Sequence, residues 1–135
     1  MKRLLLITAI IMMPALCSAQ TDKDRERFAY VCTQMNISKE LKSKLQPMFY
    51  AYMKELHVAK DIYDNLKDKN LTAIRKQRLT ADQAKQLNAA RWRSDEEVLK
   101  VRRAYTQKFA TILTPQQVYH LFSFANDSKS KRQGK

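Results

Sequence analysis

A single glycine, Gly134, occurs in this chain of 135 residues. Glycine normally makes up about 7% of a protein, and it supplies the positive φ angles that tight turns and many helix ends require. The prolines of the chain are Pro14, Pro47 and Pro115. Because residues 1–133 hold no glycine, they leave little room for β-hairpins, and the sequence predicts an all-α fold.

Two copies of the pattern Leu-Thr-x-x-Gln predict where two helices begin. The matching positions are Leu79, Thr80 and Gln83 in one copy and Leu113, Thr114 and Gln117 in the other. In such a capping box the Thr hydroxyl accepts a hydrogen bond from the amide three residues later, and the Gln side chain accepts one from the Thr amide. The Leu before the Thr can pack on the fourth helical residue, Ala84 or Val118. We therefore expect both motifs to be structural helix caps.

The start of the chain has the three parts of a secretory signal peptide. Lys2 and Arg3 make it positive, residues 4–13 are apolar, and small residues precede Gln20. An uncleaved membrane anchor is the alternative, but the apolar run is too short to span a bilayer. We expect export to the periplasm and cleavage before Gln20.

This interpretation divides the chain into three parts. Residues 1–19 would be the signal peptide, residues 20–127 a helical domain, and residues 128–135 a disordered basic tail. The chain carries a formal net charge of +13, and loss of Lys2 and Arg3 would lower it to +11. A basic exported protein meets lipid headgroups, envelope polysaccharide or acidic protein segments rather than nucleic acid, for which no binding motif occurs.

Cys32 would be the one cysteine of the exported chain, so no internal disulfide can form. It lies among Phe28, Val31 and Met35, which share one helical face. A buried thiol is therefore favoured over a link between two subunits.

Apolar residues at steps of three and four predict two long helices with shorter helices beside them. The long helices span about 39–68 and 81–112 and are joined by a basic connector over 70–78; the shorter ones span 22–35 and the residues after Pro115. Both long helices reach roughly 45 Å at about 1.5 Å per residue. We expect an antiparallel long-helix hairpin with short flanking helices, thin and elongated.

Each long helix has one seam of residues expected to face the core. On the first helix these are Leu41, Leu45, Met48, Tyr52, Leu56, Ala59, Tyr63 and Leu66. On the second they are Ala84, Leu87, Val98, Val101, Tyr105, Phe109 and Ile112. Pro47 interrupts the first seam and should kink that helix without ending it, because the stripe continues in phase.

Residues that could carry catalysis or hold a metal ion are sparse. His57 and His120 lie on different predicted helices, and no glycine-framed Ser or Cys accompanies them. The acidic run 95–97 lies among Arg and Lys residues, as on a solvated helix face. We expect a protein that is not an enzyme and that uses neither a cofactor nor a metal ion.

A second stripe on the helix 81–112 is the candidate contact surface. Trp92 and Leu99 are seven positions apart and off the seam, and cations share their face. The alternative is that they pack inside the same chain. The candidate contact residues, including two that lie off the seam of the helix 39–68, are Trp92, Leu99, Lys85, Arg103, Tyr50 and Met53. A thin layer with one face uncovered also predicts a homodimer.

The two Leu-Thr-x-x-Gln motifs, the signal peptide and the basic all-α chain resemble the Spy/CpxP family of exported proteins. Residues 45–52 and 105–115 are similar to segments of its small Bacteroidetes-type envelope members. The resemblance implies an ATP-independent periplasmic chaperone, a cradle-like antiparallel dimer that holds unfolded or stress-damaged envelope proteins. The alternative that it leaves open is a regulatory or sensor protein of an envelope-stress or metal-stress signalling system.

Overall fold

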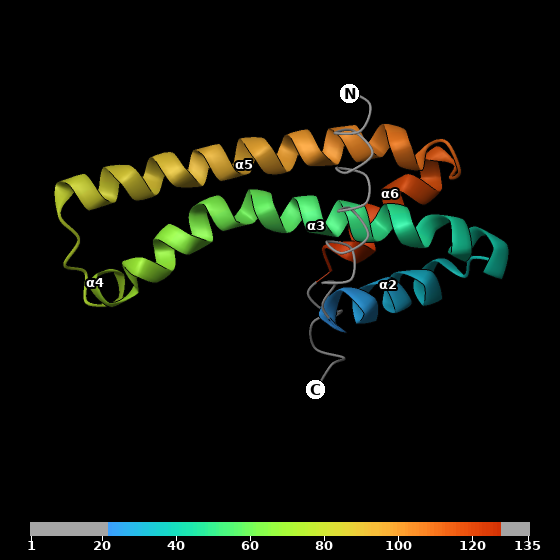
Figure 1. Ribbon diagram of the computed structural model, residues 1–135, viewed down its shortest axis with the longest axis horizontal. Coiled ribbons are helices and arrows are strands. Elements are labelled where there is room, and N and C mark those ends of the chain that lie inside the picture. Colours follow the sequence, from blue (N-terminus) through green and yellow to red (C-terminus); the bar gives the residue numbers. More distant parts are fainter. Residues whose placement is uncertain (1–21, 128–135) are drawn as a thin grey trace, which may run out of the picture. The chain divides into compact units, whose positions relative to one another are not determined.

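The computed structural model of the chain describes residues 22–127. The predicted signal peptide, its cleavage site, the predicted cap at Thr21 and the basic tail lie outside the described residues. Within them the regular elements are all helices: α2 (Asp22–Met35), α3 (Lys39–Lys69), α4 (Leu71–Arg75), α5 (Ala81–Phe109) and α6 (Pro115–Ala125) (Figure 1). The prediction of an all-α fold is confirmed. None of these helices is both long and apolar enough to cross a membrane.

The helix boundaries follow the sequence signals closely, with one exception. The helix expected to reach residue 112 ends at Phe109, three residues earlier. There the amide groups of Ile112 and Leu113 both donate to the carbonyl of Phe109, at 3.1 and 2.8 Å. Thr114 precedes a proline, which disfavours helical geometry, and it is extended with φ −72° and ψ 161°. The chain must therefore leave the helix before Thr114.

Two residues other than glycine take the left-handed conformation that glycine usually supplies. Asn36, at the end of α2, has φ 51°, and Gln77, after α4, has φ 54°. Asn tolerates this region better than most residues because its short polar side chain can form local hydrogen bonds. Just after Asn36, the hydroxyl of Ser38 accepts a hydrogen bond from the amide of Leu41 at 3.2 Å, so Ser38 caps α3.

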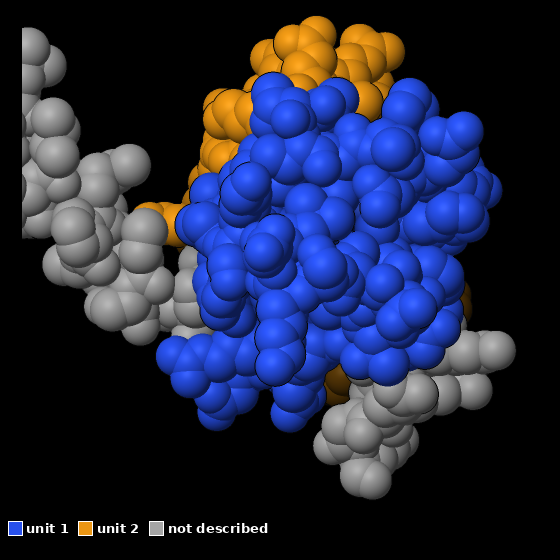
Figure 2. All heavy atoms as spheres, turned by 90° about the vertical axis from the view of Figure 1, so that its right-hand side faces the viewer, with its two compact units in different colours: residues 1–51, 109–135 blue, residues 52–108 orange. Residues whose placement is uncertain are grey.

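Contacts gather the chain into two compact units, coloured separately in Figure 2. Of the described residues, 22–51 and 109–127 belong to unit 1, and 52–108 belong to unit 2. The helix α3 runs on through the exposed Pro47, as the in-phase stripe predicted. The kink at Pro47 stays a prediction.

The core of unit 1 is built by α2, the first part of α3 and α6. The rings of Phe28 and Phe49 lie 5.2 Å apart between their centroids, and both side chains are buried. Burial of such a side chain contributes about 1.5–3 kcal/mol. Arg27 of α2 also donates to the carbonyl of Ala125 on α6 at 2.7 Å. Cys32 is buried in this core, which confirms the first of its two predicted environments.

Unit 2 is a helical hairpin made of residues 52–69 of α3 and most of α5. The hydroxyl of Ser94 donates to the carbonyl of Ala59 at 2.9 Å, and Arg91 donates to the hydroxyl of Tyr63 at 2.6 Å. Further along, the rings of Tyr52 and Tyr105 lie 5.4 Å apart. In these contacts, higher residue numbers on α5 pair with lower residue numbers on α3. The two helices are therefore antiparallel, and the predicted hairpin is confirmed.

Both predicted capping boxes are formed. At the start of α5, the amide of Gln83 donates to the Thr80 hydroxyl at 3.1 Å, and the Thr80 amide donates to the Gln83 side chain at 3.0 Å. At the start of α6, the same two bonds join Thr114 and Gln117 at 3.2 and 2.9 Å. Pro115 occupies the first position of α6, where a missing amide proton has no consequence.

We predict that Thr114→Ala lowers the free energy of unfolding by about 1 kcal/mol, because α6, whose inner face is buried, would lose its cap. Urea unfolding followed by circular dichroism measures this. Thr72→Ala is the matched control, since Thr72 is exposed within α4 and no side-chain bond of it is formed within residues 22–127. Equal stability of the Thr114 variant and the wild type would contradict the cap assignment.

Candidate functional site

The strongest candidate for a binding surface lies on α5. Trp92 and Leu99 keep 65% and 47% of their surface exposed. Seven residues make nearly two helical turns, so Lys85, Trp92 and Leu99 lie in one row, and Arg103 extends it by one further turn. We call Lys85, Trp92, Leu99 and Arg103 the α5 stripe. Its four members are exposed, as expected of a contact surface.

Acidic residues near the stripe are solvated. Asp95 and Glu96 are exposed, and Glu97 pairs with Lys100 at 3.2 Å. This agrees with the expectation of a solvated helix face and not of an enclosed pair of carboxyl groups. The stripe therefore offers apolar and charged side chains to a partner, without an enclosed pocket.

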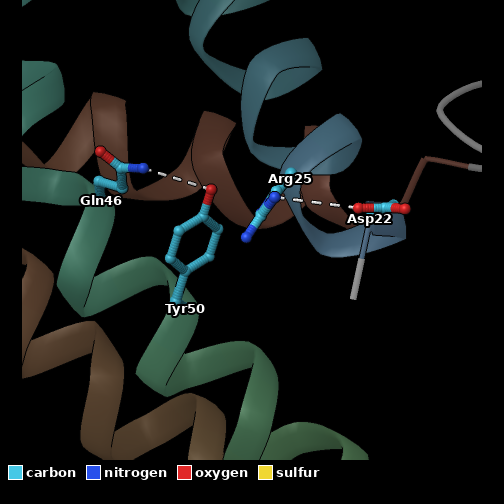
Figure 3. Close-up of polar contacts among 4 residues, drawn as sticks. All are labelled: Asp22, Arg25, Gln46 and Tyr50. Carbon is cyan, nitrogen blue, oxygen red and sulfur yellow. Dashed lines mark hydrogen bonds and ion pairs between the residues drawn. The ribbon is translucent and has the colours of Figure 1, made fainter. Parts of the chain in front are cut away.

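Two residues that we expected beside this surface lie elsewhere. Met53 is only 1% exposed, so the expectation of an accessible side chain there was wrong. Tyr50 is half-buried, and the centroids of the Tyr50 and Phe28 rings lie 5.6 Å apart in an edge-on arrangement. Figure 3 shows its hydroxyl turned toward Gln46, whose amide donates to it at 3.4 Å. The face of α3 that is buried near these residues is wider than the narrow seam that we expected.

Sequence reasoning missed an open groove in unit 2. It has a volume of about 760 Å³ and lies between α3 and α5. Its apolar lining is Val58, Ile62, Leu66, Ala89 and Ala90, and its polar lining is Asp61, Asn65, Lys69, Gln86 and Arg93. Val58, Ile62 and Leu66 follow one another at steps of four, which is a signal for a second apolar face on α3. Val58 is 65% exposed, so this groove adds apolar surface to the hairpin.

A second, smaller cavity of about 160 Å³ lies beside the first capping box. Leu79 and Ala84 both line it, as a staple across the start of α5 would require. Tyr63 and Arg91 line it too, and the guanidinium group of Arg91 lies 4.8 Å from the centre of the Tyr63 ring. The pair of Tyr63 and Arg91 therefore joins α3 to α5 beside this cavity.

Groups that could react or bind a metal ion are few in this part of the protein. Residues 22–127 hold no cluster of three or more His, Cys, Asp or Glu side chains placed to bind a metal ion. Burial raises the pKa of the Cys32 thiol, while the positive charge of Lys42 acts in the opposite direction. A thiol with a raised pKa stays protonated near neutral pH and is a poor nucleophile.

Comparison with known proteins adds no relative, since no family model, curated protein or solved structure matches the chain. The resemblance to the Spy/CpxP family therefore stays a prediction from the sequence.

We predict that Trp92, the only tryptophan of the chain, is quenched by acrylamide almost as efficiently as free tryptophan. At low ionic strength iodide should quench it better than caesium, because Lys85 and Arg103 attract anions to this face. The double variant Lys85→Gln, Arg103→Gln should reduce the difference between the two ions. Weak quenching by acrylamide would mean that the indole is covered in solution.

Proposed function

We propose that this protein is an exported, ATP-independent chaperone that binds unfolded or stress-damaged envelope proteins through the α5 stripe. The observation that carries the proposal is the exposure of Trp92 and Leu99 on a row of α5 that begins with Lys85 and ends with Arg103. Large apolar side chains exposed together on a soluble surface usually mark a contact site, and Trp and Arg contribute strongly at such sites. The function requires neither a cofactor nor a catalytic group.

Client capture would begin with charge and end with apolar contact. The full chain has a net charge of +13, which becomes +11 when Lys2 and Arg3 are lost on export. Scattered cations attract acidic segments of an unfolded chain over distances of about 10 Å at 0.1 M salt. Trp92 and Leu99 would then cover apolar side chains of the client. The open groove beside Val58 would supply further apolar surface on the same hairpin.

The test is suppression of aggregation by the chain starting at Gln20, with two unrelated denatured clients, one acidic and one basic. We expect suppression of both, with faster association of the acidic client and slower association at high salt. A regulatory protein built for one signalling partner would suppress neither. That result would reject the chaperone proposal in favour of the regulatory alternative.

The double variant Trp92→Ala, Leu99→Ala should release the client about ten times faster, as the loss of roughly 1.4 kcal/mol of contact energy predicts. Tyr119→Ala is the matched control, since Tyr119 is 70% exposed but lies on α6. Stopped-flow release of a labelled client measures both. If the two variants release the client equally fast, the α5 stripe is not the binding face.

We also propose that the chain is exported and forms a homodimer. The dimer would carry two copies of the α5 stripe. Intact-mass spectrometry of the protein isolated from its native envelope should give a chain that begins at Gln20. Light scattering of this species at high micromolar concentration should give twice that mass. A retained Met1 would reject export, and a monomeric mass would reject the dimer.

A further inference from the structure

We propose that the turn of the unit 2 hairpin docks on the surface of an anionic phospholipid bilayer. Four cationic side chains gather at this turn, where α4 joins α3 to α5 (Figure 1). We call Lys69, Arg75, Lys76 and Arg78 the basic tip. This surface is separate from the α5 stripe, and the inference does not depend on chaperone activity.

The basic tip has no acidic residue within its own segment. Residues 69–81 contain the four cations and neither Asp nor Glu. All four side chains are exposed. Elsewhere in the structure Lys100 pairs with Glu97 and Arg25 with Asp22, at 3.2 and 3.9 Å. Within residues 22–127 no ion pair or hydrogen bond engages a side chain of the basic tip, so its charge is available to an external anion.

The backbone under these cations is well ordered by hydrogen bonds. The Asn70 side chain donates to the carbonyl of Leu66 at 2.9 Å, and the Arg78 amide donates to the carbonyl of Ala73 at 2.8 Å. The capping box of Thr80 then begins α5. Because this turn is already structured, contact with a surface would not have to order a flexible loop first.

Apolar side chains among the cations distinguish a bilayer from a soluble polyanion. Leu71, Ile74 and Leu79 are each half-buried at the same turn. Ile74 and Leu79 also line the small cavity beside Tyr63. In a bilayer, headgroup phosphates would face the cations, and the exposed surface of Leu71, with what remains exposed of the other two, could enter the boundary between headgroups and acyl chains. A soluble polyanion offers only the first of these contacts. The combination of unpaired cations and accessible Leu and Ile surface therefore favours lipid.

The experiment is cosedimentation of the chain starting at Gln20 with vesicles of phosphatidylcholine, with or without phosphatidylglycerol. We expect binding only to the anionic vesicles, weakened by salt. The fourfold variant Lys69→Gln, Arg75→Gln, Lys76→Gln, Arg78→Gln should bind at least about ten times more weakly, because each cation near an anionic surface adds to affinity. Equal binding to neutral vesicles would overturn the proposal.

The matched control is Lys23→Gln, Lys39→Gln, Lys42→Gln, Lys44→Gln, which removes the same charge from exposed positions of unit 1. If both fourfold variants lose equal affinity, net charge and not the basic tip attracts the membrane.

Leu71→Ser should weaken binding to vesicles and leave binding to soluble polyglutamate unchanged. If Leu71→Ser binds the vesicles normally, the tip is a general polyanion site and the lipid assignment is wrong. Circular dichroism confirms that each variant is folded.

Discussion

The register of α5 on α3 determines what the rest of unit 2 can do. It is held by the buried hydroxyl of Ser94, which reaches the carbonyl of Ala59 at 2.9 Å. A serine at this position has a small side chain, and its buried hydroxyl has a hydrogen-bond acceptor, so its burial leaves that hydroxyl satisfied. Tyr63 with Arg91 on one side, and Tyr105 with Glu55 on the other, hold the same register.

Once this register is set, the exposed faces follow from helical geometry. Leu87, Ser94 and Tyr105 turn toward α3 and are buried. Trp92 and Leu99 then point away from that face, because they are five residues from Leu87 and from Ser94, respectively, which is about 140° around a helix. Ala89 and Ala90 are too small to fill the edge of the interface beside Val58 and Ile62, and the groove remains there.

Much of this fold could be predicted from local signals. The Thr80 and Thr114 boxes marked helix starts because their bonds join residues three positions apart, so no tertiary contact is needed to recognise them. The exposure of Trp92 followed from its phase relative to the apolar seam. Three cations of the basic tip, Arg75, Lys76 and Arg78, lie in the predicted basic connector over 70–78. Their exposure and their lack of ion pairs depend on how the turn folds, which local signals do not determine.

Other features could not be predicted from local signals. The burial of Met53 depends on how wide a face α3 buries. Phe49 is also fully buried although it lies outside the predicted seam, so this face is wider than the seam of Tyr52 and Leu56. The groove joins Val58 to Ala89, which are far apart in the chain, so only the register of the hairpin brings them together. Ser94 is polar and was therefore left out of the predicted seam, although its hydroxyl is the contact that sets the register.

The hairpin of unit 2 also combines a small core with a large exposed surface. Two paired helices bury only one face of each, so the outer faces stay available without the need for a cavity. Leaving Trp92 65% exposed forgoes the stability that its burial would contribute. A chain optimised for stability alone would place a smaller or polar residue there. The hairpin instead keeps indole, leucine and cations together on α5, which is the composition that an adaptable protein contact requires.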